Sequence, residues 1–435
     1  MMMRCLKVII AAGSIAALSL GSAAGQGTRP AEVGFGVFTF TSGPAAAYGM
    51  PGRNAAELLI EQMNGTGGIG GVRIKPIYVD EGQGTDGVVA EFRRLAADNA
   101  NQVMLAALSS ANCLALAPVA EQLQMPTFMW NCDTHQLFLK DKYKYVYRTN
   151  SSTVPEFIAC AFYLLSVKPD VKKIAIIDPD YAFGRDAGLI FKEALKALKP
   201  DVEVVAELYP KLGSPTYNTE ISRLVAAQPD VIFSNLWGAD LENFVHQAAP
   251  RQLFTRSQVI LALGESVLQR VGGSLPDGVI VGVIGDGWWL SPDSQSKPQT
   301  KAFVEAYRQR YNEYPVFPSF KMANSLHAVK AIYEKALAAG KDRWPTRDDL
   351  VAAAKDFKTQ TFTGTLQLRE DNDGLVDQIV GVTARDSHYP FPIIGSMVRY
   401  PASLVTPPVG TEPIAWIGNL KASALASLPK PGSYK

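Results

Sequence analysis

Hydrophobic and polar positions alternate along the chain with two distinct periods. From Val33 onward, short runs rich in Val and Ile are separated by segments in which apolar residues recur at helical spacing. Such runs are typical of buried parallel strands, and the segments between them of crossover helices. The first set of predicted strands covers residues 34–39, 72–79, 103–108 and 126–130, with helices at 52–63, 87–98 and 115–123. This order predicts one doubly wound α/β unit.

The same alternation of strand and helix patterns begins again after residues 145–149. Predicted strands cover 173–177, 202–208, 231–236 and 259–262, with helices at 156–165, 185–198, 220–227 and 240–247. Two such units in tandem each leave the carboxyl ends of their strands open, which is where ligands bind in sheets of this kind. We therefore expect a ligand cleft where the two open ends face each other.

The last third of the chain adds fewer strands. We predict a strand at 278–284, helices at 300–311, 319–339 and 347–357, and a hairpin of 363–368 with 375–382. Leu326, Val329, Tyr333 and Leu337 recur at helical spacing and are expected to form a buried face. From Asp386 onward the chain is rich in proline, so we expect an extended segment that lies over the surface.

The first residues have the features of an export signal. Arg4 and Lys7 precede an apolar run, 8–20, which is too short for a comfortable membrane crossing, and residues 22–25 are small. We predict that residues 1–25 are a signal peptide that is cleaved. The mature chain is then expected in the periplasm.

Composition and charge narrow the functional classes. The chain has 435 residues, 47% of them apolar, with 42 Lys and Arg against 41 Asp and Glu. A chain of this size and composition is typical of a globular protein with two or three domains. A net charge of +1 gives no long-range electrostatic attraction for phosphate backbones, so nucleic acid is not an expected partner.

The number and spacing of the cysteines do not define a set of disulfide bonds. Cys5 belongs with the signal, which leaves Cys113, Cys132 and Cys160, an odd number. We predict three buried free thiols, although a bridge between Cys113 and Cys132 stays open in an oxidising compartment.

The sequence patterns that could indicate a cofactor, a metal ion or catalysis have the wrong spacing or lie between the wrong elements. The G-x-G-x-x-G pattern at 65–70 ends a predicted helix and precedes a strand, whereas a dinucleotide site needs the opposite order. It predicts a helix C-cap and a turn. The acidic run 370–374 lacks the spacing of a calcium loop. No catalytic motif and no metal-ligand spacing of the histidines is found in the sequence, so we expect no cofactor, no metal and no enzyme.

Polar and aromatic residues gather where predicted strands end. Residues 38–49 follow the first strand and 109–112 the third. The segments 41–49, 55–58, 63–71, 108–110, 117–120, 147–149, 174–177, 181–184 and 362–364 resemble the leucine/isoleucine/valine-binding family. These are type I periplasmic solute-binding proteins of ATP-driven (ABC) importers. The resemblance covers most of the mature chain and is strongest in the opening segment.

This resemblance implies a set of ligand-binding residues. The serine loop gives Ser110 with Ser109 beside it, the next turn gives Asn131 and Asp133, and the opening motif gives Tyr48. The second lobe gives Phe183, Trp237 and Glu265. Ser110 and the backbone N–H groups after it would bind a carboxylate, whereas Glu265, with Asp133, would accept an amine or a hydroxyl.

Two departures from the family pattern bear on the ligand. Phe183 stands where the family usually has tyrosine, and the turn 130–135 carries larger polar residues in place of small ones. An aromatic pocket with few cations suits an aromatic carboxylate about as well as an apolar or aromatic amino acid.

The resemblance also implies the organisation of the chain. We expect two α/β lobes, one from 29–149 plus 287–357 and the other from 150–286 plus 358–435, joined by hinge crossings near Arg148, Asp286 and Thr361. A monomer would close on its ligand and dock on an ABC permease. Two alternatives stay open: a secreted hydrolase that uses Ser109, Ser110 or Cys132 with His135 in the same cleft, and a periplasmic ligand sensor of the same fold.

Overall fold

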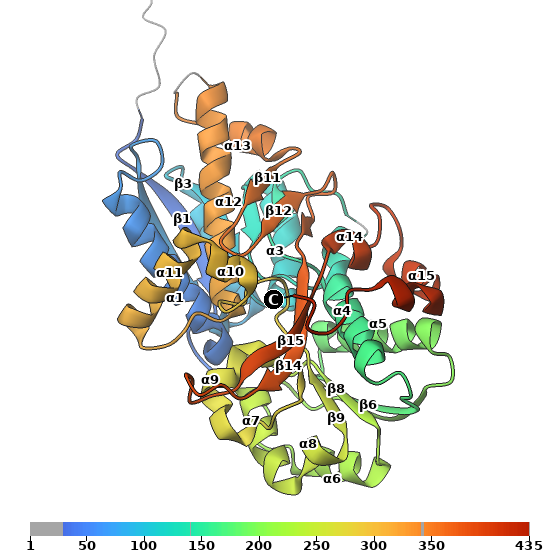
Figure 1. The fold of residues 1–435 in the computed structure, drawn as a ribbon. Coiled ribbons are helices and arrows are strands. Elements are labelled where there is room, and N and C mark those ends of the chain that lie inside the picture. The colour runs from blue at the N-terminus through green and yellow to red at the C-terminus, as the bar shows by residue number, and fades with distance from the viewer. Residues whose placement is uncertain (1–28, 140, 341–342, 435) are drawn as a thin grey trace, which may run out of the picture.

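The computed structural model describes residues 29–139, 141–340 and 343–434. The predicted signal peptide, 1–25, lies outside the described residues, as does Cys5. Two sheets with helices on their faces build the two halves of the molecule (Figure 1). The fold class predicted from the alternating pattern, α/β with two doubly wound units, is confirmed.

The first half is built on a parallel sheet. Its strands lie in the order β2-β1-β3-β4-β5. The elements are β1 (Glu32–Thr39), α1 (Ala46–Gly65), β2 (Arg73–Asp80), α2 (Thr85–Ala97), β3 (Asn101–Ala106), α3 (Ser110–Gln122), β4 (Thr127–Met129) and β5 (Val146–Arg148). The order reverses between β1 and β3, so their carboxyl ends flank the switch point at which doubly wound sheets bind ligands.

The second half repeats this architecture. Its sheet has the order β15-β14-β10-β9-β8-β6-β7, in which the five strands from β6 to β10 are parallel. The elements are α4 (Thr153–Val167), β6 (Lys173–Ile177), α5 (Ala182–Leu198), β7 (Glu203–Leu208), α6 (Asn218–Ala227), β8 (Val231–Ser234), α7 (Gly238–Ala248), α8 (Leu253–Arg256), β9 (Gln258–Leu261), α9 (Leu268–Val271) and β10 (Ile280–Gly282). Its switch point lies between β6 and β8.

The remaining chain returns to the first half and then to the second. The elements are α10 (Pro292–Ser296), α11 (Pro298–Tyr311), α12 (Phe317–Ala339), α13 (Arg347–Ala354), β11 (Lys358–Gln360), β12 (Thr365–Leu368) and β13 (Gly374–Leu375). Helix α12 packs against α1, and the predicted face of Leu326, Val329, Tyr333 and Leu337 is buried. Strands β11, β12 and β13 form a small antiparallel sheet.

One prediction for the end of the chain is confirmed only in part, and another is wrong. The hairpin of 363–368 with 375–382 forms only at its tip, where β12 pairs antiparallel with β13, because β14 (Gln378–Ala384) then leaves the small sheet and pairs with β10. The chain after Asp386 is not simply extended, because β15 (Ile393–Tyr400) pairs with β14, and α14 (Ala402–Val405) and α15 (Pro413–Gly418) follow. Prolines stand just outside β15, which is an edge strand, and they give this part of the sequence the appearance of a loop.

The glycine-rich segment after α1 is confirmed as a helix end and a turn. Helix α1 ends at Gly65, and Gly67 and Gly68 have φ angles of 97° and 72°. Only glycine adopts such angles without strain, which explains the spacing that imitates a dinucleotide motif. The start of α1 was predicted too late, at residue 52, because Pro51 lies inside the helix.

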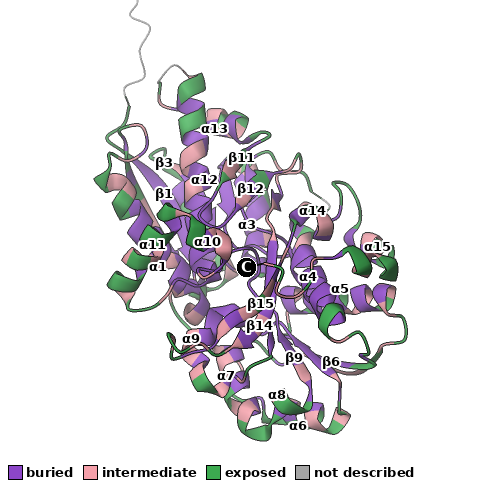
Figure 2. Cartoon of the chain, in the orientation of Figure 1, coloured by how far each residue is buried: buried purple, intermediate pink, exposed green. Residues whose placement is uncertain are grey.

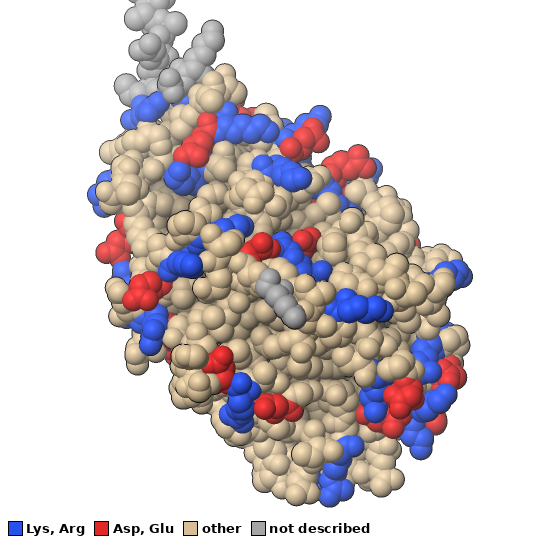
Figure 3. Space-filling model, in the orientation of Figure 1, with Lys and Arg blue, Asp and Glu red and all other residues tan. Residues whose placement is uncertain are grey.

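Buried residues concentrate on the sheets and on α4, whereas exposed residues line the outer helices (Figure 2). Helix α4 is buried on nearly every side because β14 packs beside it. On the face drawn in Figure 3, acidic and basic side chains are mixed, and no large area carries one sign. None of the described helices is long and apolar enough to cross a membrane.

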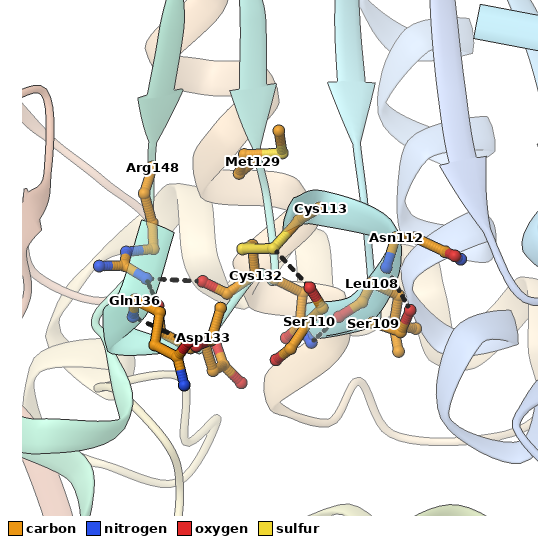
Figure 4. Close-up of a disulfide and its surroundings, with 12 residues drawn as sticks. Leu108, Ser109, Ser110, Asn112, Cys113, Met129, Cys132, Asp133, Gln136 and Arg148 are labelled. Atoms are coloured by element: carbon orange, nitrogen blue, oxygen red, sulfur yellow. Dashed lines mark hydrogen bonds between the residues drawn. A yellow bond between two sulfur atoms is a disulfide. The ribbon is translucent and has the colours of Figure 1, made fainter. Parts of the chain in front are cut away.

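The prediction of three free thiols is wrong. Cys113 and Cys132 form a disulfide with a Cα–Cα distance of 6.0 Å, and Cys160 is the buried free thiol among the described residues. The first turn of α3 lies beside the turn that follows β4, which brings the two cysteines together (Figure 4). An odd count in the sequence does not forbid one bridge, and the export signal was the cue for it.

We expect loss of this disulfide to destabilise the protein. It closes a loop over a sequence separation of 19, so C113A/C132A should lower the free energy of unfolding by about 3 kcal/mol. Urea denaturation followed by tryptophan fluorescence measures this loss. Reductant should destabilise the natural protein and the control C160A but not the double variant. Equal stability of the double variant and the natural protein would contradict the bridge.

Candidate ligand-binding site

A small cavity lies between the two halves, and its empty space, including the part that is open to solvent, is about 250 Å³. Its walls are Tyr48, Leu108, Ser110, Asn131 and Asp133 from the first half and Tyr181, Phe183, Trp237 and Leu263 from the second. The structure thus brings together six of the eight residues singled out in the sequence. Ser109 and Glu265 do not line this cavity, whereas Tyr181 and the two leucines were not anticipated.

The topology explains why these residues meet. Tyr48 and Ser110 follow β1 and β3, which flank the switch point of the first sheet. Phe183 and Trp237 follow β6 and β8, which flank the switch point of the second sheet. The open ends of the two sheets therefore face each other across the cavity, as the tandem pattern predicts.

The serine loop presents the N-terminus of α3 to the cavity. The Ser109 hydroxyl accepts a hydrogen bond from the backbone N–H of Asn112 (3.2 Å), so Ser109 is the N-cap and Ser110 is the first helical residue. Unpaired N–H groups and the helix dipole at this position favour a ligand carboxylate. Ser109 therefore has a structural role, while Ser110 is the serine at the cavity.

Glu81 holds this loop from behind. Its carboxylate accepts hydrogen bonds from the backbone N–H of Leu108 (2.6 Å) and from the side chain of Asn112 (2.8 Å). Burial raises the pKa of Glu81 to about 7, although these hydrogen bonds act in the opposite direction and lower it. Glu81 was not predicted as a functional residue, although an acidic residue directly after a strand was an available signal.

The turn after β4 carries the other polar groups of the first half. Asn131 accepts a hydrogen bond from the Tyr48 hydroxyl (3.2 Å) and donates one to the Leu108 carbonyl (3.3 Å). Asp133 is fully buried, and its Oδ1 atom accepts hydrogen bonds from Lys321 (2.8 Å) and from Asn150. The neighbouring Cys132 ties this turn to α3, which fixes Ser110 relative to Asp133 (Figure 4).

Arg148 supports the turn from β5. Its guanidinium donates to the carbonyls of Cys132 and Thr134 and forms a two-pronged ion pair with Asp373 at 2.6 and 2.7 Å. Arg148 is 1% exposed, so every one of these bonds is shielded from water. The segments where we expected the chain to cross between halves also adjoin, because Thr363 donates to Asp286 (2.6 Å) and Arg148 N–H to the Asn372 carbonyl (3.0 Å).

Aromatic side chains form the opposite wall. The Trp237 indole donates to the Tyr181 hydroxyl (3.1 Å), and its ring meets the edge of Tyr48 with centroids 5.5 Å apart. Tyr181 supplies a phenolic hydroxyl near Phe183, which stands where the family usually has a tyrosine. Burial raises the pKa of Tyr48 far above 10, so its hydroxyl stays protonated.

Glu265 points to α12 instead of the cavity. Its Oε2 atom accepts a hydrogen bond from the backbone N–H of Phe317 (2.8 Å), the first residue of α12. Burial raises the pKa of Glu265 to about 8. Since β9 belongs to the second sheet and α12 packs on the first half, this bond joins the two halves.

Other side chains also join the halves directly. Gln269 of the second half donates to the Tyr314 carbonyl (3.0 Å) and accepts from its N–H (2.9 Å). Thr134 of the first half donates to Asp186 of α5 (3.1 Å). The two halves are therefore in a closed arrangement around the cavity.

Two of the groups that a hydrolase would need have other partners. Cys132 is bonded to Cys113, and His135 is hydrogen-bonded to Thr153 (3.2 Å) and lines a second cavity beside Pro407 and Glu412. In the described part of the chain, no cluster of three or more His, Cys, Asp or Glu side chains could hold a metal ion.

Comparison with known proteins places the chain in a family. A sequence profile described as "Periplasmic binding protein" matches residues 32–386. The chain belongs to the periplasmic binding protein family. The resemblance seen in the motifs is confirmed, and Leu/Ile/Val-binding protein homolog 8 of Brucella abortus is 26% identical over 344 residues. That match covers 75% of this chain and 80% of the relative.

Solved structures of periplasmic binding proteins share the fold. One is a solute-binding protein of an ABC transporter from Rhodopseudomonas palustris BisB5 in complex with 3,4-dihydroxybenzoic acid, with a TM-score of 0.74, 22% identity, and coverage of 88% of this chain and 100% of that one. Another is LivJ of Streptococcus pneumoniae in complex with isoleucine, with a TM-score of 0.71, 18% identity, and coverage of 85% and 99%. These likenesses support the two-sheet fold.

We expect the buried Glu265 to give stability a pH dependence. Because its pKa is raised from 4.5 to about 8 on folding, the folded chain keeps a proton that the unfolded chain has released. The free energy of unfolding should therefore fall as the pH rises from about 4.5 to about 8.

Glu265→Gln, which keeps the acceptor for Phe317, should flatten this fall. Urea denaturation at several pH values measures the slope, with the exposed Glu203→Gln as the matched control. The same slope in Glu265→Gln and in the control would refute the assignment.

Proposed function

We propose that the chain is a periplasmic solute-binding protein that captures a small organic acid between its two halves and delivers it to an ABC permease. The cavity at the facing strand ends carries this proposal, since Ser110 and the N-terminus of α3 stand on one wall and aromatic rings on the other. The family match and the sequence features of an export signal support the location.

The lining favours an aromatic carboxylate as the ligand. Tyr181, Phe183 and Trp237 offer flat apolar surface, which stacks well on an aromatic ring. The family member from Rhodopseudomonas palustris was solved with 3,4-dihydroxybenzoic acid, and the LivJ structure with isoleucine. Glu265, which we expected to hold an amine, is bonded to Phe317 and is absent from the cavity lining. An apolar or aromatic amino acid is therefore the second candidate.

The proposed mechanism is binding with closure, without bond chemistry. Residues from both halves touch the same cavity, so a ligand there would favour the closed arrangement over an open one by its contacts to both. The closed monomer would then present a surface that a permease recognises. A ligand sensor would use the same closure with a different membrane partner.

A thermal-shift screen tests this function. Amino acids, benzoates, phenylpropanoids and amides are added singly, and a true ligand raises the melting temperature by mass action. We expect at least one aromatic carboxylate to do so. No shift with any acid or amino acid would contradict the proposed function.

Variants of the two serines make the screen specific. Ser110→Ala should keep the melting temperature of the free protein but weaken binding tenfold or more, because a hydrogen bond to a charged group is lost. The matched control, Ser109→Ala, should lower the melting temperature through loss of the N-cap but keep the ligand-induced shift. The reverse pattern would show that the other serine binds the ligand.

A further inference from the structure

A lysine lies buried directly behind the ligand cavity. Lys321 is in the second turn of α12, and its side chain is 7% exposed. Its ammonium nitrogen lies 2.8 Å from Oδ1 of Asp133 and 3.7 Å from Oε1 of Glu156, and 5.5 Å from the centre of the Phe317 ring. Asp133 lines the cavity, whereas Lys321 does not. Lys321 therefore acts on the cavity through Asp133.

The negative charge of Asp133 is balanced by the positive charge of Lys321. Burial, together with the neighbouring Asp133, raises the pKa of Glu156 far above its usual value, which favours its neutral form, and its Oε1 atom accepts a hydrogen bond from Ser151 (2.9 Å). Arg148 is paired with Asp373 through both prongs of its guanidinium. This leaves the Asp133 carboxylate and the Lys321 ammonium as one neutral pair beside the cavity.

An unpaired Asp133 would oppose an anionic ligand. A carboxylate at Ser110 and a bare carboxylate at Asp133 would share one small cavity between buried side chains, where like charges repel more strongly than in bulk water. Lys321 cancels this repulsion. The Asp133 carboxylate then keeps its capacity to accept a hydrogen bond from a ligand hydroxyl.

The same pairing disfavours an ammonium group. A ligand ammonium would enter a cavity whose one carboxylate is already neutralised by Lys321, and Glu265 is engaged with Phe317. A buried cation without a counter-charge is costly, whereas a neutral hydroxyl is not.

We propose that Lys321 is a positioning residue that sets ligand specificity: by pairing with Asp133 it makes the cavity select an organic anion with a neutral hydroxyl over a ligand with an ammonium group. This inference rests on the proposed function. Lys321 lies within residues 317–326 of α12, which are all buried, and such a core position would not hold an unpaired charge.

Calorimetric titration with three matched acids tests the proposal. The probes are benzoate, 4-hydroxybenzoate and 4-(aminomethyl)benzoate. We expect the natural protein to bind 4-hydroxybenzoate at least tenfold more tightly than the amine. K321M, which keeps the length and the apolar stem, should weaken 4-hydroxybenzoate at least tenfold and move the preference toward the amine at least tenfold.

A double variant separates charge from structure. In D133N/K321M both charges of the pair are gone, so affinity for benzoate, which has no hydroxyl for residue 133 to bind, should return to within about threefold of the natural protein, whereas K321M should bind benzoate more weakly. A merely structural role for Lys321 would leave the double variant as weak as K321M, and that result would overturn the proposal.

If K321M does not fold, D133N alone tests the proposal. It keeps the shape of the side chain and leaves Lys321 as an uncompensated cation, so benzoate should bind at least threefold more tightly than to the natural protein. Unchanged or weaker benzoate binding in D133N would also overturn the proposal. If the natural protein prefers the amine, this inference fails while the binding function stands; if it binds no acid or amino acid, the proposed function itself fails.

Discussion

The site depends on one constraint, which is that the turn after β4 must be held rigidly although it is buried and polar. Cys132 is bonded to Cys113, the carbonyls of Cys132 and Thr134 accept from Arg148, and Asp133 accepts from Lys321. Each bond comes from a different element, namely α3, β5 and α12. Buried polar groups are tolerated only when they are paired, so these partners are what allow Asn131 and Asp133 to stand at the cavity.

The two halves contribute different chemistry to the cavity. The first half supplies hydroxyl, amide and carboxylate groups on a wall that is fixed by covalent and ionic links. The second half supplies mainly aromatic rings, of which those of Tyr181 and Phe183 have centroids 6.1 Å apart. Hydrogen bonds that join the halves directly, from Phe317 to Glu265 and from Thr134 to Asp186, add to the closed arrangement. A ligand that contacts both walls would act on the same equilibrium as these bonds, which is how binding and closure would be coupled.

Much of the fold was predictable because parallel strands buried on both faces leave short Val- and Ile-rich runs, such as 174–177 and 231–233. The positions of Tyr48 and Ser110 were predictable because residues after such strands must lie at the open edge of a sheet. Side-chain directions were not. Glu265 follows β9 at that edge, yet its carboxylate reaches Phe317, and no local pattern gives the distance from β9 to α12. Tyr181 was not predicted because the resemblance points to residue 183 in the same segment. Lys321 was not predicted because it lies in a helix whose pattern indicates only a buried core. The strand β15 was missed because the prolines around it resemble a loop.

A crystal structure of the protein with 4-hydroxybenzoate tests the central claim most directly. The account predicts that the ring lies between the Asn131–Asp133 turn and Trp237, with the carboxylate at Ser110 and the hydroxyl at Asp133, whose carboxylate stays paired with Lys321. Ligand density in the cavity beside His135 and Pro407, or a ligand that contacts only one half of the molecule, would contradict it.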